Sequence, residues 1–298
     1  MTAPNQMMNN KSQPTIATVY RDIISRLSPS LGDGESRAAA RVIMEDVRGA
    51  TPTDLVVNGD RTVEPPTLGR IYDIVARIIS GEPVQYAVGS ARFYGMDFTV
   101  TPDVLIPRPE TEGLVDMIVS QWSGRDDLRV LDCGTGSGCI AIALARNLPF
   151  SAIDAIDISN AALKVAEENS RRLKTSVGFY RRDILKLTPP DAPLYDIIVS
   201  NPPYIARDEA AAMDDRVLGY EPAGALFVPD DNPLIFYRAI SAYAVKALKA
   251  GGRLYFEINP RFRDAMTAML ADDGFTDIDT RRDYLGRYRF VSASKPAI

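Results

Sequence analysis

The sequence Asn201-Pro202-Pro203-Tyr204 follows the apolar stretch 197–200 and can present two hydrogen-bond acceptors in a fixed direction. A residue before proline is restricted to extended geometry, and neither proline has an N–H donor. The side-chain oxygen of Asn201 and the carbonyl oxygen of Pro202 therefore form a rigid acceptor pair, which suits the two N–H donors of a planar –NH₂ group. Tyr204 can pack on such a flat group. The alternative is a kinked loop in which Asn201 is only a cap.

A glycine-rich turn is the second candidate: Asp132-Cys133-Gly134-Thr135-Gly136-Ser137-Gly138 ends an apolar stretch and opens a predicted helix. Such a turn lets a ligand approach the backbone and offers N–H groups at the helix start. The spacing differs from the dinucleotide pattern G-x-G-x-x-G, and no Gly-Lys-Ser/Thr phosphate loop is present. Asp132 suits a ligand with positive charge better than a pyrophosphate. The alternative is a plain strand–helix turn without a ligand.

Two further acidic positions follow predicted strands. Asp157, about twenty residues after the glycine turn, can accept hydrogen bonds from ribose hydroxyls, or it can simply cap the next helix. Asp183 and the apolar Ile184 follow the next strand, where they can flank a nucleobase or form a solvated turn.

The composition excludes several classes of enzyme. The 298 residues include no histidine, which excludes Ser-His-Asp systems, histidine-ligated zinc and a histidine general base. We expect the two cysteines, Cys133 and Cys139, to pack as small apolar side chains, and we expect no metal site. The net charge of −5 argues against binding nucleic acid mainly through a positive field. No apolar run has the length of a membrane span and residues 1–13 do not resemble a signal peptide, so we expect a cytoplasmic protein.

The elements that must position these residues alternate between strand and helix from residue 110 onward. This alternation predicts an α/β fold with a doubly wound, mostly parallel seven-stranded sheet and an antiparallel C-terminal hairpin. The predicted strands are 129–132, 152–157, 177–180, 195–200, 253–257, 275–280 and 288–292, and the predicted helices are 110–121, 138–147, 160–172, 234–249 and 261–271.

Helical periodicity dominates the first ninety residues instead. It predicts a small bundle with helices near 16–27, 35–47, 53–57 and 67–79. The order Phe93-Tyr94-Gly95, followed by 98–100, predicts a β-hairpin in a connector over residues 89–109.

The glycine turn, Asp157 and the Asn-Pro-Pro-Tyr sequence together resemble class I S-adenosylmethionine-dependent methyltransferases that modify planar amino or amide nitrogens. The stretches 81–86, 93–95 and Val104-Leu105-Ile106-Pro107-Arg108-Pro109-Glu110-Thr111-Glu112 narrow the resemblance. With Glu221-Pro222 and Asp273-Gly274-Phe275, they resemble the release factor glutamine methyltransferases (the PrmC/HemK family). The resemblance covers nearly the whole chain after the N-terminal tail.

This resemblance implies methyl transfer from S-adenosylmethionine to the side-chain amide nitrogen (N5) of the glutamine in the Gly-Gly-Gln motif of peptide-chain release factors, leaving S-adenosylhomocysteine. It implies that Asn201, Pro202 and Tyr204 are catalytic and, with Pro203, bind the glutamine amide. The cofactor-binding residues it implies are Asp132, Gly134, Thr135, Gly136, Ser137, Gly138, Asp157, Asp183, Ile184 and Asn201.

The resemblance also implies a division into a flexible tail (1–13), a helical substrate-recognition domain (14–88), the connector (89–109) and the S-adenosylmethionine-binding methyltransferase domain (110–298). We expect a monomer with no direct contact to nucleic acid or membrane. Arg108 and Glu110 either form a lid over the cofactor or an interdomain ion pair.

The main competing function is adenine-N6 methylation of DNA or RNA, because an adenine amino group fits the same acceptors. The spacing of the glycines argues against a nicotinamide oxidoreductase. The intact motifs argue against a binding module that has lost turnover.

Overall fold

The computed structural model describes residues 13–297, so the predicted tail lies outside the described residues except for Gln13. The described residues divide into two compact units, with the boundary between Val88 and Gly89. Residues 89–109, the predicted connector, belong to the second of these units. No helix within residues 13–297 is long and apolar enough to cross a membrane.

The first unit is helical. It contains α1 (Ile16–Arg48), α2 (Pro52–Val57), α3 (Pro65–Ile79) and the short α4 (Val84–Val88). Gly32 interrupts α1 with a non-helical backbone (φ 74°, ψ 168°), which corresponds to the gap between the two predicted helices. The apolar stripe of α1, including Val19, Ile23 and Leu27, is fully buried with Ile71 of α3 in one core.

The second unit is built on a seven-stranded sheet. Its strands are β3 (Arg129–Cys133), β4 (Ala152–Asp157), β5 (Gly178–Arg181), β6 (Tyr195–Ser200), β9 (Leu248–Glu257), β10 (Thr276–Arg282) and β11 (Tyr288–Ser294). Their order in the sheet is β10-β11-β9-β6-β3-β4-β5. Within this sheet, only β11 pairs antiparallel to its neighbours, β9 and β10. The predicted fold class is therefore confirmed.

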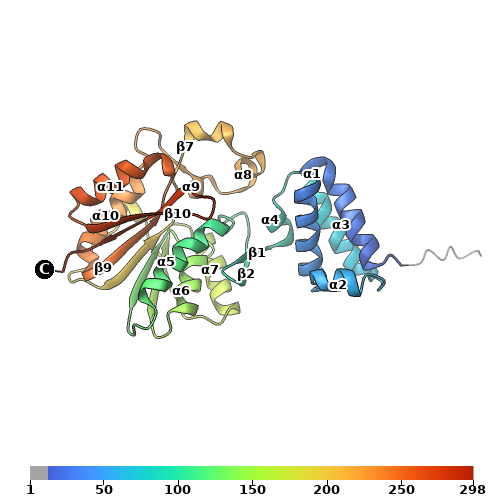
Figure 1. Ribbon diagram of the computed structural model, residues 1–298, viewed down its shortest axis with the longest axis horizontal. Helices are drawn as coiled ribbons and strands as arrows, with labels where there is room; N and C mark the ends of the chain where they lie inside the picture. Colours follow the sequence, from blue (N-terminus) through green and yellow to red (C-terminus); the bar gives the residue numbers. More distant parts are fainter. Residues whose placement is uncertain (1–12, 298) are drawn as a thin grey trace, which may run out of the picture. The chain divides into compact units, whose positions relative to one another are not determined.

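Helices cover both faces of this sheet. One face carries α5 (Glu112–Trp122), α6 (Cys139–Asn147) and α7 (Asn160–Arg172), and the opposite face carries α10 (Ile235–Ala247) and α11 (Arg263–Asp272) (Figure 1). Neighbouring residues of the central strands alternate between the two cores: Val130 packs with the first set of helices and Leu131 with the second. This alternation is the two-residue period of a strand buried on both faces.

Shorter elements surround the sheet. The hairpin β1 (Ser90–Phe93) and β2 (Met96–Thr99) is held to α7 by Asn169, whose side chain bonds both the N–H of Thr99 (2.7 Å) and its carbonyl oxygen (3.0 Å). The remaining elements are α8 (Asp215–Tyr220), α9 (Ala223–Leu226), β7 (Ile205–Ala206), β8 (Phe227–Val228), and the 3-10 turns η1 (Pro109–Thr111), η2 (Ile184–Lys186), η3 (Arg207–Ala212) and η4 (Pro260–Phe262).

Strand order places the predicted site residues together. The chain runs from β3 through β4 to β5 on one side, then returns to place β6 on the other side of β3. In an open α/β sheet, the carboxyl ends of the strands at such a reversal are where ligands bind. The glycine turn follows β3 and Asn201 follows β6, so both lie at this position.

Candidate active site

A cavity of about 450 Å³ opens at the carboxyl ends of the central strands. It gathers side chains and backbone from most of the predicted site segments. The predicted residues that line it are Gly134, Thr135, Gly136, Ser137, Asp157, Asp183, Ile184, Asn201 and Pro203. Asp132 and Gly138, at the two ends of the turn, do not line this cavity, and neither do Pro202 and Tyr204.

The glycine turn is held against the end of β4. The N–H groups of Gly134 and Thr135 both donate to the carbonyl oxygen of Ile156, at 2.8 and 3.0 Å. The N–H of Gly136 donates to Oδ2 of Asp157 at 2.9 Å, while Oδ1 of Asp157 accepts from the N–H of Ser159 at 2.9 Å. Asp157 thus organises two loops and also lines the cavity, and each carboxylate oxygen retains a lone pair for a further donor.

Asp132 lies beneath the turn with no solvent exposure. Its Oδ2 accepts a hydrogen bond of 2.6 Å from the hydroxyl of Thr135, while its Oδ1 has no partner among the described residues. Burial, with a smaller contribution from the charge of Asp157, raises the pKa of Asp132 to about 7. A buried carboxylate oxygen without a donor is costly, and a nearby cation would reduce that cost.

Asp183 and Ile184 form another wall of the cavity, after β5. Oδ1 of Asp183 accepts from the N–H of Leu185 at 3.0 Å, and this bond starts η2. Ile184 is only 9% exposed and covers the turn, since its Cδ1 lies 3.6 Å from the place a Cβ on Gly134 would occupy. Ile158 and Leu185 also line the cavity although they are 59% and 45% exposed. These side chains give the wall an apolar surface beside one carboxylate.

Asn201 stands between two cavities. A smaller cavity of about 230 Å³ is lined by Asn201, Pro202 and Tyr204, together with residues of the η3–α8 segment and α9. Asn201 lines the larger cavity as well, as do Leu105, Arg108 and Ala225. The side-chain Nδ2 of Asn201 donates to Oγ1 of Thr111 at 3.3 Å. Among the described residues no hydrogen bond uses the Oδ1 of Asn201 or the carbonyl oxygen of Pro202, so both acceptors are available to a ligand.

Two residues beside Asn201 were not predicted from the sequence as site residues. Thr111 donates through Oγ1 to Oε2 of Glu257 at 2.6 Å, and the hydroxyl of Tyr204 donates to Oε1 of Glu257 at 3.0 Å. Both Thr111 and Glu257 are almost completely buried. One feature of the sequence could have indicated Glu257: it is an acidic residue that directly follows the apolar residues 254–256, at the end of the strand that pairs with β6.

The tyrosine of the Asn-Pro-Pro-Tyr sequence remains a phenol. Burial and then the charge of Glu257 raise the pKa of Tyr204 far above its usual value, while Arg289, which donates to the phenol oxygen at 3.3 Å, opposes that rise. Tyr204 therefore cannot act as a base at neutral pH, and its side chain lines the smaller cavity.

Arg108 and Glu110 make contacts within the second unit. Arg108 forms an ion pair of 2.6 Å with Glu221, whose side chain is 1% exposed, and Glu110 accepts from the hydroxyl of Tyr284 at 3.2 Å. The sequence left a lid over the cofactor and an interdomain ion pair as alternatives for these residues. Arg108 forms an ion pair whose two partners both lie inside residues 89–298. Because Arg108 lines both cavities, the pair fixes part of their common wall.

Comparison with known proteins identifies the family. The Methyltransferase small domain matches residues 111–218, and the PrmC N-terminal domain matches residues 19–89. The release factor glutamine methyltransferase of Bacteroides thetaiotaomicron is 41% identical over 88% of this chain and 93% of its own length. The chain belongs to the release factor glutamine methyltransferase family. The enzyme of the same name from Flavobacterium psychrophilum is 35% identical over 92% of this chain and 98% of its own length.

A solved methyltransferase structure has a fold similar to that of this protein. The T. thermophilus 16S rRNA N2 G1207 methyltransferase, in complex with AdoMet and guanosine, superposes with a TM-score of 0.51 at 21% identity, covering 69% of this chain and 49% of the other. At this identity the likeness concerns the fold alone. The family assignment does not favour the adenine-N6 alternative, which rested on the shared geometry of the acceptors.

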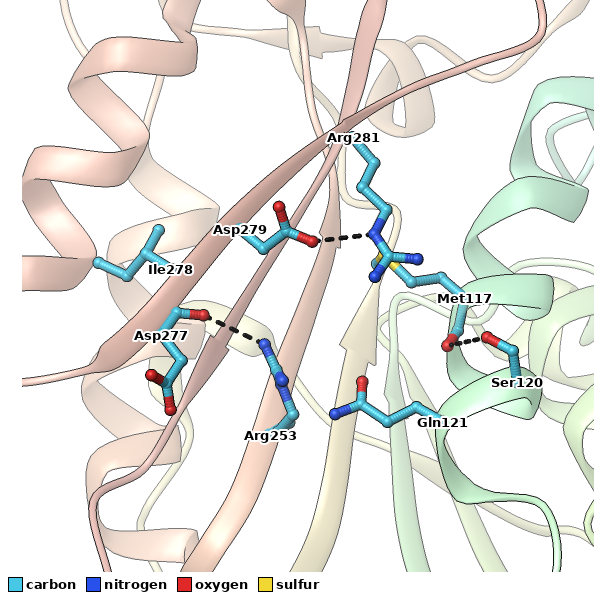
Figure 2. A pocket seen from close by; sticks show the side chains of 8 residues that line it. All are labelled: Met117, Ser120, Gln121, Arg253, Asp277, Ile278, Asp279 and Arg281. Atoms are coloured by element: carbon cyan, nitrogen blue, oxygen red, sulfur yellow. Dashed lines mark hydrogen bonds and ion pairs between the residues drawn. The ribbon is translucent and has the colours of Figure 1, made fainter.

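A separate hollow of about 540 Å³ lies between α5 and the edge strand β10 (Figure 2). Its lining differs from that of the two cavities at Asn201. Its polar groups bond to one another: Arg281 donates to Asp279 at 2.9 Å, and Arg253 donates to the carbonyl oxygen of Asp277 at 3.1 Å. Figure 2 shows these side chains spread along the walls and not converging on a common point. None of the residues predicted for the site lines this hollow.

Proposed function

We propose that this protein transfers a methyl group from S-adenosylmethionine to the side-chain amide nitrogen of the glutamine in the Gly-Gly-Gln motif of peptide-chain release factors. The observation that carries the proposal is the position of Asn201, which lines both the larger and the smaller cavity and has its side-chain carbonyl oxygen available. A cofactor in the larger cavity and a glutamine side chain in the smaller one would then meet at this residue.

The chemical groups that line the larger cavity suit S-adenosylmethionine. The residues we propose to hold it are the glycine turn, Asp157 for the ribose hydroxyls, and Ile184 with Asp183 for the base. A Cβ on Gly136 would meet nothing within 4 Å, so the turn leaves open space for a ligand. The unpartnered Oδ1 of Asp132 supports a positively charged ligand close to the turn. When bound, S-adenosylmethionine supplies an electrophilic methyl group.

The residues around the smaller cavity act by orientation. An amide nitrogen is a poor nucleophile because its lone pair is delocalised into the carbonyl group. Two acceptors, Oδ1 of Asn201 and the carbonyl oxygen of Pro202, would hold the two N–H groups and aim the nitrogen toward the larger cavity. Orientation of this kind contributes roughly 7–11 kcal/mol in favourable model reactions. The same acceptors stabilise the positive charge that develops on the nitrogen during transfer.

No basic side chain is required in this mechanism. The alkylated amide is a strong acid and releases its proton to water, and the nearby phenol of Tyr204 stays protonated. Release factors as the substrate, a monomeric state and a cytoplasmic location accompany the proposal as predictions.

The direct test incubates the purified protein with methyl-labelled S-adenosylmethionine and a folded release factor. We expect label in the wild-type release factor and none in a release factor whose motif glutamine is replaced by alanine. An adenine-containing oligonucleotide serves as the competing substrate. Label in the oligonucleotide with none in the release factor would overturn the proposal.

A further inference from the structure

A chain of hydrogen bonds joins Asn201 to a buried carboxylate. Nδ2 of Asn201 donates to Oγ1 of Thr111 at 3.3 Å, and Oγ1 of Thr111 donates to Oε2 of Glu257 at 2.6 Å. The three residues come from three different elements: the end of β6, η1 and the end of β9. Thr111 and Glu257 are 2% and 1% exposed, so the bond between them is buried, while the bond from Asn201 is part-buried.

The chemistry of this chain of bonds fixes its direction. An ionised carboxylate only accepts hydrogen bonds, so the single proton of the Thr111 hydroxyl points to Glu257. Oγ1 of Thr111 then has only lone pairs left for Asn201. The Asn201 amide must therefore turn its NH₂ toward Thr111, because the opposite orientation would place two oxygen atoms together without a proton.

Packing alone cannot make this choice. The oxygen and nitrogen of an asparagine amide have nearly the same size, so the surrounding hydrogen bonds decide which of them faces a ligand. With NH₂ held by Thr111, the carbonyl oxygen of Asn201 faces the substrate and accepts from an –NH₂ group. With the amide reversed, Asn201 would offer N–H donors, which suit a carboxylate instead.

We propose that Glu257, acting through Thr111, sets the orientation of the Asn201 amide and so makes the site select glutamine over glutamate. This inference rests on the proposed function. It assigns Thr111 and Glu257 as positioning residues. Thr111 lines the larger cavity but not the smaller one, and Glu257 lines neither, so both act on the glutamine amide through other side chains, Thr111 through Asn201. A site built around specific hydrogen bonds rejects an analogue that leaves its polar groups unpaired.

The first test compares Thr111→Val with Thr111→Ser in the full-length protein. Valine keeps the volume but removes the hydroxyl, and serine keeps the hydroxyl. We expect T111V to lower kcat for release-factor methylation roughly 10- to 100-fold, and T111S to restore it to within about threefold of wild type. Thr267→Val, on α11 and outside the site, is the matched control and should leave kcat unchanged.

The second readout is selectivity in binding. Release factors carrying either glutamine or glutamate at the motif are titrated into the protein in the presence of S-adenosylhomocysteine. The wild type should prefer glutamine, and T111V should reduce that preference by about tenfold or more because its Asn201 amide can reverse. A purely structural role for Thr111 would weaken both forms equally.

Glu257→Gln is the variant that keeps the inference testable if T111V does not fold. The hydroxyl of Tyr204 still needs an acceptor, so the oxygen of the introduced amide faces Tyr204 and its NH₂ faces Thr111. Thr111 then accepts from this NH₂ and donates to Asn201, which reverses the Asn201 amide. We expect E257Q to lose glutamine methylation and to shift binding toward the glutamate form.

The two failures are distinguishable. A wild-type protein that does not methylate the release factor contradicts the proposed function. A wild-type protein that methylates it, while T111V or E257Q keeps both kcat and the glutamine preference, overturns this inference alone. Equal losses in T111V and T111S would also overturn it, because the hydroxyl would then not be the feature that matters.

Discussion

Arg108 and Glu221 form an ion pair of 2.6 Å between the segment that precedes α5 and the loop that precedes α9. Glu221 also accepts from the N–H of Ile106 at 3.2 Å, so its carboxylate holds this segment at two points. Arg108 and Ala225 of α9 line both cavities. The pair therefore fixes one wall that the larger and the smaller cavity share.

Removing the arginine of this pair should destabilise the protein. Arg108→Met keeps an aliphatic side chain and leaves the buried Glu221 carboxylate with a single backbone donor. Loss of one partner of a buried pair costs about 3–5 kcal/mol, and the partial exposure of Arg108 reduces the expected loss to about 2 kcal/mol. Chemical denaturation of Arg108→Met and wild type measures this loss of unfolding free energy. Adding Glu221→Gln should recover part of the loss, and a double variant as unstable as the sum of the single variants would contradict the coupling.

Asp132 should make the ligand-free protein less stable as pH rises. Its folded-state pKa of about 7 lies above the value near 3.9 of an unfolded aspartate. The loss of stability caused by ionising the buried Asp132 is absent below about pH 4. It grows between about pH 4 and pH 7 and amounts to a few kcal/mol above pH 7. Asp132→Asn should therefore raise the free energy of unfolding at about pH 8 and not at about pH 4. The same variant should bind S-adenosylmethionine more weakly, and denaturation at both pH values with calorimetric titration checks the two effects.

Replacing Gly136 or Gly138 of the turn by alanine should lower the free energy of unfolding by different amounts. At Gly138 (φ 81°), a Cβ would lie 3.0 Å from Cδ1 of Ile142 and 3.1 Å from Cβ of Ala166. Gly136 (φ 53°) has nothing within 4 Å. We expect Gly138→Ala to lower the free energy of unfolding by about 2–3 kcal/mol and Gly136→Ala by about 1 kcal/mol.

Gly136→Ala should weaken cofactor binding more than Gly138→Ala, because Gly136 lines the larger cavity and Gly138 does not. Thermal unfolding with and without S-adenosylmethionine separates the two effects, since only a bound ligand raises Tm. Gly69→Ala, on α3 of the first unit at a position with ordinary φ and open space, is the control. Equal cofactor-induced shifts in Tm for G136A and wild type would show that the turn does not contact the ligand.

Activity should fall in acid before the protein unfolds. Burial raises the pKa of Glu257, and the charge of Glu110 adds to the rise, while Thr111, Arg289 and Tyr204 oppose it. Protonated Glu257 no longer requires the Thr111 proton, so the direction of the hydrogen-bond chain is lost. Protonation of a group with a raised folded-state pKa does not itself destabilise the fold, because that contribution to stability is largest at low pH.

The measurement is kcat against pH, with circular dichroism at each pH. We expect an acid limb above the pH at which an ordinary glutamate titrates, about 4.3. T111V should lack this limb, because its Asn201 no longer depends on Glu257. An identical acid limb in T111V and wild type would assign the titration to another group.

The sequence predicted the parts of this molecule that depend on local pattern. Strands buried on both faces are apolar along their whole length, and a glycine turn after such a strand is visible without any distant contact. Strands of two residues, such as β7 and β8, are too short to show a period, and they were not predicted. The five-residue helix α4 was missed for the same reason.

The hydrogen-bond chain behind Asn201 could not be predicted. Thr111 and Glu257 are separated by 146 positions in the sequence, and Glu257 comes near Asn201 only because β9 pairs with β6. The bond between Asp132 and Thr135 and the complete burial of Asp132 were not visible in the sequence either. Burial of a polar group and the identity of its partner are decided by tertiary packing, and one sequence does not contain that information in a local pattern.

Tandem mass spectrometry of a release factor incubated with this protein and S-adenosylmethionine tests the central claim most directly. The account predicts a single methyl group on the side-chain amide of the motif glutamine, with more than about a hundredfold slower transfer by the Asn201→Ala variant. A methyl group on any other residue would contradict it, and so would an unchanged rate in N201A with the methyl on the same amide.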